Sequence, residues 1–182
     1  GSLTMTDITK EWSTALVTGA QSRDLLSGIV EGADLTKGWL TLQDATIAGV
    51  PCKLMRISFC GELGWEVHTS FEDSKAAYEA IRNAGAKPFG MYALNSMRIE
   101  KGYRTWKGDL STDYTLLEGG MERFIRFNKP QDFVGKAALL AEKEAGVKKM
   151  FVTMTVDAPF ADAPYMSTIW NGDEVVGETT SG

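Results

Sequence analysis

The sequence predicts an α+β fold, in which a ferredoxin-like split βαβ region precedes the start of a small antiparallel β-domain, expected to be a β-barrel. Two observations predict this. Strand-like runs with alternating apolar residues flank amphipathic helical segments in the order strand, helix, strand. From Lys148 onward, short alternating runs surround a Pro-rich loop. We therefore expect one domain over residues 3–146 and a second, truncated one over residues 147–182.

The first elements follow from local patterns. A short strand around Leu16-Val17 precedes a Gly turn and a helix from about Ser22. Residues 38–59 read as two strands joined by a turn at Ala48-Gly49. Ser70 and Asp73 have the spacing of a capping box for the next helix, which Asn83-Ala84-Gly85 ends. We expect its buried face to contain three residues: Ala77, Tyr78 and Ile81.

The later elements are a helix over Met91–Lys101 that stops at Gly102, turns over residues 111–120, and a return to strand-like alternation at 123–128. A third helix is expected over 132–146, and the Asn171-Gly172-Asp173 turn predicts a β-hairpin. The residues of this half that we expect to be buried are Ala137, Leu140 and Ala141 on the third helix, with Phe124, Phe127 and Phe133.

Composition restricts the class of protein. A chain of 182 residues with 43% hydrophobic and 24% charged residues is ordinary for a globular protein. No run approaches the ~20 apolar residues of a spanning helix, so no membrane partner is expected. The net charge is −5 without a Lys/Arg cluster, which argues against nucleic acid. Cys52 and Cys60 fit reduced, buried residues better than a disulfide framework.

The most informative segment is ISFCGELGWEVH, residues 57–68. It reads as a strand that breaks at Gly61, exposes Glu62 and resumes at Gly64. A Gly-Glu-x-Gly break indicates a bulge or a close approach of backbone to another group. A carboxylate there can accept two parallel hydrogen bonds from an amidine-like edge, such as that of a pterin or guanine ring. The alternative is a turn glutamate that faces water.

The sequence lacks the patterns of metal sites and of nucleotide-binding sites. His68 is the only histidine, and no clustered ligands surround it, so we expect no metal site and interpret it as a partly exposed strand residue. We interpret Glu66 as a structural or solvated carboxylate. Neither a GxGxxG fingerprint after a strand nor a P-loop is present.

Three motifs, in order, resemble one known family. GELGWEVH, then YALNSMRIEKGYRTWKGDL at 92–110, then FNKPQDFVGKAAL at 127–139 are similar to the folate-binding half of the aminomethyltransferase (glycine-cleavage T-protein) family. The similarity is greatest to the C-terminal region of dimethylglycine and sarcosine dehydrogenases. It covers nearly the whole chain, and the first motif is the most distinctive.

The resemblance implies tetrahydrofolate as the cofactor and Glu62 as a ligand of its pterin ring, whose loss would cost roughly 1–3 kcal/mol. Arg98 lies in the family's SLRLE-type helix, where the family's folate-contacting arginine, just upstream, is replaced by Leu94. Arg98 takes that role from the next turn, or makes a structural ion pair. Trp106 stands where relatives carry an aromatic lining the folate cavity, with interior packing as the alternative.

The implied reaction is the second half of a demethylation. Flavin (FAD), in an upstream domain outside this chain, oxidises a methylated amine, and the methyl-derived carbon is captured as 5,10-methylenetetrahydrofolate. The family's catalytic aspartate lies upstream of the region represented here, so no catalytic residue is assigned to this chain, Asp44 and Asp109 included. We expect a fragment that carries part of the folate pocket and no complete active site.

Two alternatives stay open: a family member that keeps the scaffold as a binding or assembly domain without folate chemistry, and a plain ferredoxin-like interaction module. Leu94 favours the first of these, whereas the intact Gly61-Glu62 pair favours one-carbon transfer. Reduced cysteines fit either bacterial cytoplasm or the mitochondrial matrix. Fold resemblance alone does not decide function.

Overall fold

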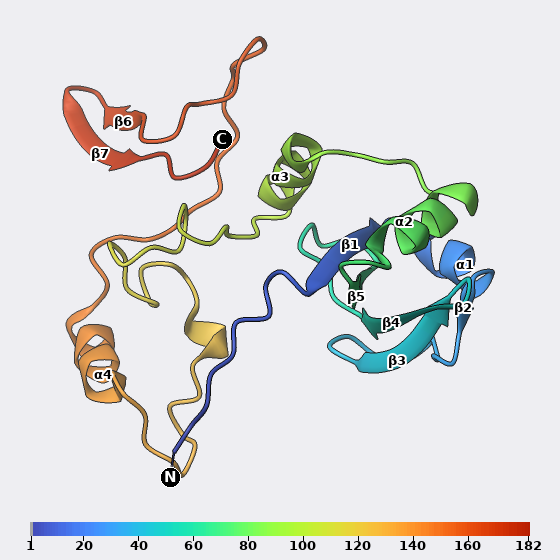
Figure 1. Ribbon diagram of the computed structural model, residues 1–182. Helices are drawn as coiled ribbons and strands as arrows, with labels where there is room; N and C mark the ends of the chain where they lie inside the picture. The colour runs from blue at the N-terminus through green and yellow to red at the C-terminus, as the bar shows by residue number, and fades with distance from the viewer. Residues whose placement is uncertain (1) are drawn as a thin grey trace. The chain divides into compact units, whose positions relative to one another are not determined.

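The computed structural model describes residues 2–182 and has the predicted α+β class (Figure 1). The chain forms two compact units, the first ending at Arg98 and the second beginning at Ile99. Helix α3 (Met91–Glu100) contains this boundary. Among the described residues, none of the helices is long and apolar enough to span a bilayer.

The first unit is built on a five-stranded sheet with the strand order β1-β5-β4-β3-β2, in which all neighbours are antiparallel. Its strands are β1 (Trp12–Thr18), β2 (Val30–Glu31), β3 (Leu42–Ile47), β4 (Val50–Met55) and β5 (Gly64–Ser70). It follows from the alternating pairings that β1 and β2 run parallel, with the other strands between them. Helix α1 (Ser22–Ser27) joins β1 to β2, which makes a split βαβ connection, as predicted.

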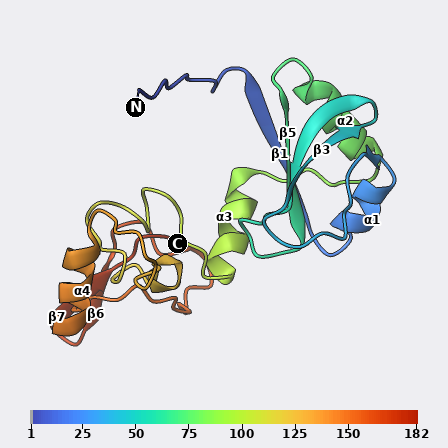
Figure 2. The same cartoon turned by 90° about the horizontal axis from the view of Figure 1, so that it is seen from below.

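The core lies on one face of this sheet, where α1 and α2 (Ser74–Asn83) cover it (Figure 2). Alternate strand residues point to that face, because successive side chains of a strand lie on opposite sides. The buried members of this cluster are Val17, Leu26, Ala45, Ile47, Cys52, Leu54, Trp65, Val67 and Ile81. The sequence positions Glu62 just before the first core residues of β5.

The opposite face of the sheet carries a polar row of side chains beside a largely apolar one that contains Leu16, Met55 and Leu42. Thr14, His68, Lys53 and Asp44 lie opposite one another on four adjacent strands. The Thr14 hydroxyl is 2.9 Å from His68 Nδ1, and Lys53 Nζ donates to Asp44 Oδ1 at 2.7 Å. A row of polar and charged side chains on one face is typical of a sheet packed on the other side only.

Several local predictions for the first unit are confirmed. Ala48 and Gly49 form the β3–β4 turn with φ of 51° and 83°, as a tight hairpin turn requires. The Ser70 hydroxyl accepts a hydrogen bond from the Asp73 amide at 3.1 Å, and α2 ends at Asn83. α3 begins at Met91 as predicted.

Two predictions for this unit are wrong. Residues 57–60 form no strand, because the chain leaves the sheet at Met55 and re-enters it only at Gly64. The alternation of apolar and polar residues at 57–60 reflects partial burial in a loop instead. Tyr78 is 45% exposed, since α2 buries only the narrower stripe of Ala77 and Ile81.

The second unit has much less regular structure. It contains η1 (Glu122–Phe124), α4 (Lys136–Ala145), β6 (Thr168–Asn171) and β7 (Glu174–Glu178). The predicted hairpin is confirmed, with Gly172 at φ 61° in the turn. β6 and β7 form a two-stranded sheet, and no closed barrel is present among the described residues. The domain boundary near residue 147 stays a prediction.

The turns predicted over residues 111–120 are present, whereas the predictions of a further strand and of buried residues in this unit fail for a common reason. Residues 123–128 form no strand; η1 and turns occupy them. α4 is shorter than predicted, and Ala137, Leu140 and Ala141 on it are exposed. Phe124 is 57% exposed, and Phe127 and Phe133 are only partly buried. The apolar side chains of these segments recur with regular spacing, but no sheet or helix packs over them.

Candidate functional site

The loop between β4 and β5 presents Glu62 to solvent. Gly61 has φ 76°, a left-handed conformation that glycine adopts without strain, so the chain turns sharply just before Glu62. Glu62 is exposed, and its carboxylate makes no hydrogen bond or ion pair with any described residue. It is therefore available to a ligand.

The C-terminal side of this loop is fixed to the end of β1. The Leu63 carbonyl accepts hydrogen bonds from the Gly19 amide at 2.8 Å, the Ser22 hydroxyl at 3.1 Å and the Thr18 hydroxyl at 3.3 Å. At Gly64, an added Cβ would meet Thr18 Oγ1 and the Val17 carbonyl at 3.1 Å. This is the close backbone approach that the Gly-Glu-x-Gly pattern predicts.

The N-terminal side of the loop is fixed through Cys60, which is 2% exposed. Its sulfur lies 3.3 Å from Thr18 Oγ1 and 3.6 Å from Ser58 Oγ. Burial raises the pKa of the Cys60 thiol, but hydrogen bonds from Thr18, the Glu62 amide and Ser58 outweigh it and lower the pKa overall. Sequence patterns alone did not identify this role of Cys60.

Trp65, just after the loop, is 1% exposed and packs under two cations. The guanidinium carbons of Arg23 and Arg56 lie 5.9 and 5.8 Å from its ring centroid. Arg56 also donates to the Lys37 carbonyl at 2.5 Å. The start of β5 is thus held by packing as well as by hydrogen bonds.

Arg98 lies on α3 and is 2% exposed. Its Nε and Nη2 donate to Asn95 Oδ1, one turn earlier on the same helix, at 2.9 and 2.6 Å. The guanidinium thus has at least one structural partner within its own helix. Glu62 and Arg98 both belong to the first unit.

Trp106 belongs to the second unit and is 78% exposed, so the interior-packing alternative for it is wrong. It sits in a tight loop in which Lys107 has φ 67°. Asp109 holds this loop: it is 1% exposed, and its Oδ2 accepts from the Thr105 amide at 2.8 Å. The Trp106 indole face is open to a stacking partner.

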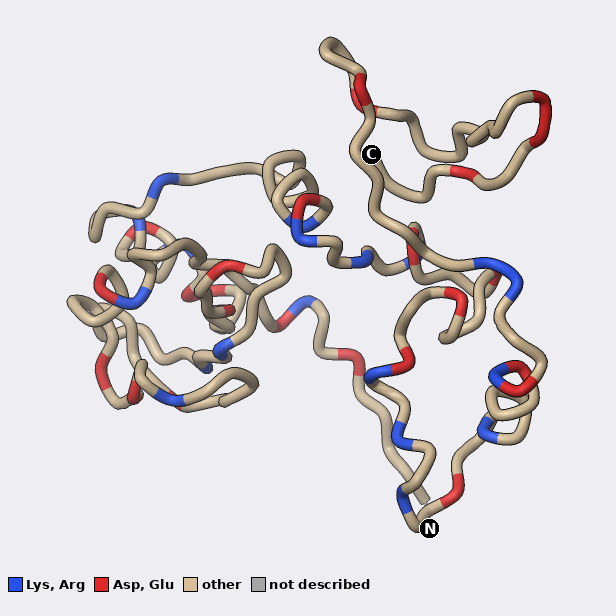
Figure 3. Tube along the Cα trace, turned by 180° about the vertical axis from the view of Figure 1, so that it is seen from behind, with Lys and Arg blue, Asp and Glu red and all other residues tan. Residues whose placement is uncertain are grey.

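The other polar groups show no second site. His68 has a side chain 28% exposed, with Nε2 3.1 Å from Glu66 Oε2, which agrees with its structural interpretation. Within residues 2–182, no group of three or more His, Cys, Asp or Glu side chains is arranged to hold a metal ion. Acidic and basic residues alternate along the trace without a basic cluster (Figure 3).

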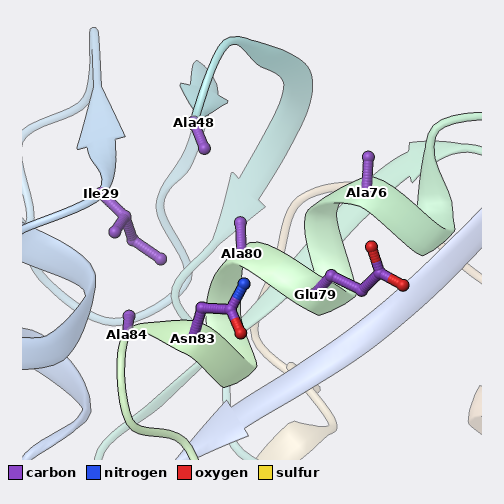
Figure 4. Close-up of a pocket in the computed structure, with 7 residues that line it drawn as sticks. All are labelled: Ile29, Ala48, Ala76, Glu79, Ala80, Asn83 and Ala84. Atoms are coloured by element: carbon purple, nitrogen blue, oxygen red, sulfur yellow. The ribbon is translucent and has the colours of Figure 1, made fainter.

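A hollow between α2 and the β3–β4 turn contains none of the candidate residues (Figure 4). It is lined by Ile29, Ala48, Ala76, Glu79, Ala80, Asn83 and Ala84. Mostly methyl groups face it, and they offer few hydrogen-bonding partners to a polar ligand. The loop of Glu62 is therefore the candidate site.

Comparison with known proteins shows the family to which the chain belongs. The family model described as the GCVT N-terminal domain matches residues 2–129. Human mitochondrial dimethylglycine dehydrogenase is 38% identical over 97% of this chain and 21% of its own length. Human mitochondrial sarcosine dehydrogenase is 34% identical over 88% of this chain and 18% of its own length.

A Listeria monocytogenes aminomethyltransferase is 30% identical over the whole chain and half of its own length. The chain thus spans about a fifth of the dehydrogenases and half of the aminomethyltransferase. Because the family model matches well over half of the sequence, the chain belongs to the GCVT N-terminal domain family, which it shares with aminomethyltransferases and with dimethylglycine and sarcosine dehydrogenases.

Proposed function

We propose that this chain is a tetrahydrofolate-binding one-carbon transfer module of a flavin-linked demethylating dehydrogenase, of the dimethylglycine or sarcosine type. One observation carries the proposal: Glu62 is an exposed carboxylate without a partner among the described residues, on a loop held at one end through Cys60 and at the other through the Leu63 carbonyl. A surface glutamate that serves only solubility has no need of such a fixed backbone.

The carboxylate fits the cofactor chemically. A pterin ring presents adjacent N–H groups on one planar edge, and an ionised carboxylate accepts two parallel hydrogen bonds from such an edge. When bound, tetrahydrofolate supplies the nitrogen atoms that accept the one-carbon unit. Glu62 holds and orients the ring, and orientation of two reactants is a large part of the barrier reduction in such transfers.

Arg98 and Trp106 complete the proposed set of folate contacts. Trp106 offers an exposed indole face on which an aromatic ring of the ligand stacks. Arg98 is proposed from its place in the family's SLRLE-type helix, one turn after the position where the family carries a folate-contacting arginine and this chain has Leu94. The role of Trp106 is carried over from the family.

The rest of the reaction lies outside this chain. FAD and the methylated amine are held by an upstream flavin domain, the first partner of this module, and the parent protein works in bacterial cytoplasm or in the mitochondrial matrix. The names of the mitochondrial dehydrogenases and bacterial aminomethyltransferases among the relatives support this proposal. We assign residues 3–146 to the folate-binding domain and 147–182 to the start of the next one.

A second candidate function is a non-catalytic scaffold of the same family. Leu94 favours it, because an apolar side chain stands where the family carries a folate-contacting arginine. The two candidates differ in one property, the affinity for reduced folate.

Titration calorimetry with 5-formyltetrahydrofolate tests the proposal. We expect the chain to bind, and Glu62→Ala to weaken the affinity at least tenfold, about 1.4 kcal/mol. Glu66→Ala is the matched control, since Glu66 is engaged with His68 on the sheet and should leave the affinity within about twofold. Equal affinity of Glu62→Ala and the unchanged chain would contradict the proposal; absence of binding, in the chain and in its longer parent alike, would favour the scaffold.

A further inference from the structure

The exposed indole of Trp106 stands on a short loop that runs from Thr105 to Leu110, which we call the Trp106 loop. The Thr105 carbonyl accepts hydrogen bonds from the Asp109 amide at 3.2 Å and from the Leu110 amide at 3.1 Å. The Lys107 amide donates to the Leu110 carbonyl at 3.1 Å. The peptide groups on both sides of Trp106 are therefore bound within the loop, although its side chain is 78% exposed.

A buried carboxylate joins this loop to the end of the chain. Asp109 is 1% exposed, and its Oδ2 accepts a hydrogen bond from the Thr105 amide at 2.8 Å. Its Oδ1 accepts from the hydroxyls of Thr180 and Ser181 at 2.5 and 2.7 Å, and these residues lie 71 and 72 positions later in the sequence. All four residues belong to the second unit. One oxygen of the carboxylate thus binds the loop, and the other binds the C-terminal segment.

The loop and the C-terminal segment also approach each other closely at Gly108. A Cβ added there would lie 2.7 Å from Thr105 Cγ2 and 3.4 Å from the Thr180 carbonyl oxygen. A side chain at this position would therefore force its neighbours apart, which explains the glycine. Thr180 lies against the loop at two points, through its carbonyl near Gly108 and through its hydroxyl at Asp109.

We propose that Asp109, held by the hydroxyls of Thr180 and Ser181, is a positioning residue for Trp106: it fixes the Trp106 loop so that the indole face is already oriented when an aromatic pterin-type ring stacks on it. The inference deepens the proposed function and depends on it for the identity of the ligand and for the contact with Trp106. Stacking on a fixed loop loses less conformational entropy than stacking on a mobile one, so these hydrogen bonds raise the affinity without touching the ligand.

Amide hydrogen exchange of the 182-residue chain tests the positioning without any ligand. We expect the Thr105 amide to exchange about fivefold faster, or more, in Thr180→Val, because the lost hydrogen bond releases the carboxylate to which this amide donates. Thr180→Ser keeps a hydroxyl and should restore most of the protection. Thr179→Val is the matched control, since the Thr179 hydroxyl donates to the Pro164 carbonyl at 2.5 Å, and it should leave the Thr105 amide unchanged.

Two results of this exchange experiment would overturn the inference. One is equal exchange of the Thr105 amide in Thr180→Val and in the unchanged chain, and the other is equal acceleration by Thr179→Val. If Thr180→Val does not fold, Ser181→Ala replaces it with the same expected result, because it removes the other hydroxyl that donates to Asp109. An unchanged Thr105 amide in that variant would overturn the inference too.

Titration with 5-formyltetrahydrofolate distinguishes positioning of Trp106 from a purely structural role. We expect Thr180→Val to weaken the affinity of the unchanged chain about three- to tenfold. In a chain that already carries Trp106→Ala, we expect the same change to have less than about a twofold effect, because effects that pass through one residue are not additive. An equal loss of affinity in both backgrounds would overturn the inference, as would an unchanged affinity in either single variant.

Failure of this inference and failure of the proposed function give different results. A weaker affinity in Glu62→Ala without one in Thr180→Val would overturn the inference alone. If the unchanged chain binds no folate, the proposed function fails, while exchange of the Thr105 amide still decides whether Thr180 holds the Trp106 loop.

Discussion

The two units of this chain are ordered by different interactions. Among residues 2–182, all buried apolar residues except Leu117 lie in the first unit, where a sheet and two helices share one core. In the second unit, Asp109 is 1% exposed, and its Oδ1 accepts from the hydroxyls of Thr180 and Ser181 at 2.5 and 2.7 Å. The first unit is held mainly by apolar burial, and the second mainly by hydrogen bonds between loops.

This difference determines where function can be placed. A carboxylate on a loop is held precisely only if the elements beside it are rigid. Glu62 follows that rule, because its loop is fixed to β1, α1 and β5 of the packed sheet. Substitutions in the two units should therefore differ in their effects on stability.

The same substitution should have very different costs in the two units. Leu54 is 0% exposed on β4, so Leu54→Ala should lower the free energy of unfolding by about 2–5 kcal/mol. Leu140 on α4 is 43% exposed, so Leu140→Ala should change it by no more than about 0.5 kcal/mol. Urea denaturation, monitored by tryptophan fluorescence, measures the change in the free energy of unfolding for both variants. Similar costs would show that the second unit has a core of its own.

The second unit should depend on a buried carboxylate instead. Asp109→Asn keeps the shape but removes the charge that strengthens hydrogen bonds from Thr105, Thr180 and Ser181, and should cost about 1–3 kcal/mol. Hydrogen exchange of the Thr105 amide measures this loss of stability at the loop itself. Asp113→Asn, at an exposed aspartate, is the control and should have little effect. An equally small effect of both changes would contradict a polar centre in this unit.

The two thiols should titrate on opposite sides of the ordinary value of 9.0. Cys60 has a lowered pKa, so its contribution to stability is present above pH 9 and is lost as the pH falls through its folded pKa. Cys52 has a raised pKa, so its contribution is present below pH 9 and is lost as the pH rises through its folded pKa. Thiolate absorbance of the Cys52→Ala and Cys60→Ala variants separates the two titrations. A lower pKa for the Cys52 thiol than for the Cys60 thiol would contradict the difference between the core and loop environments.

The smallest effect concerns Tyr114, whose hydroxyl donates to Glu178 Oε1 at 2.6 Å. This hydrogen bond, with partial burial, raises the pKa of Tyr114 to about 12. Its contribution to stability is present below pH 10 and is lost as the pH rises toward 12. Glu178→Gln should return the pKa toward 10, as measured by tyrosinate absorbance. An unchanged titration would show that the hydrogen bond does not persist in solution.

The sequence predicted the first unit far better than the second. Alternation and turn residues identified the β3–β4 hairpin and the end of α2 because these depend on neighbours in sequence. Ala137 and Leu140 were placed inward because helical periodicity indicates a covering surface, which α4 lacks. Glycine spacing predicted the exposure of Glu62. The role of Cys60 was not predictable, because its partner Thr18 lies 42 residues away in sequence.

We expect reduced folate to bind at the fixed loop between β4 and β5. Addition of 5-formyltetrahydrofolate to the ¹⁵N-labelled chain, followed by amide NMR spectra, tests it most directly. We expect the largest shifts at Gly61, Glu62 and Leu63, and we expect Glu62→Ala to abolish them. Shifts confined to other residues, with these three amides unchanged, would contradict it.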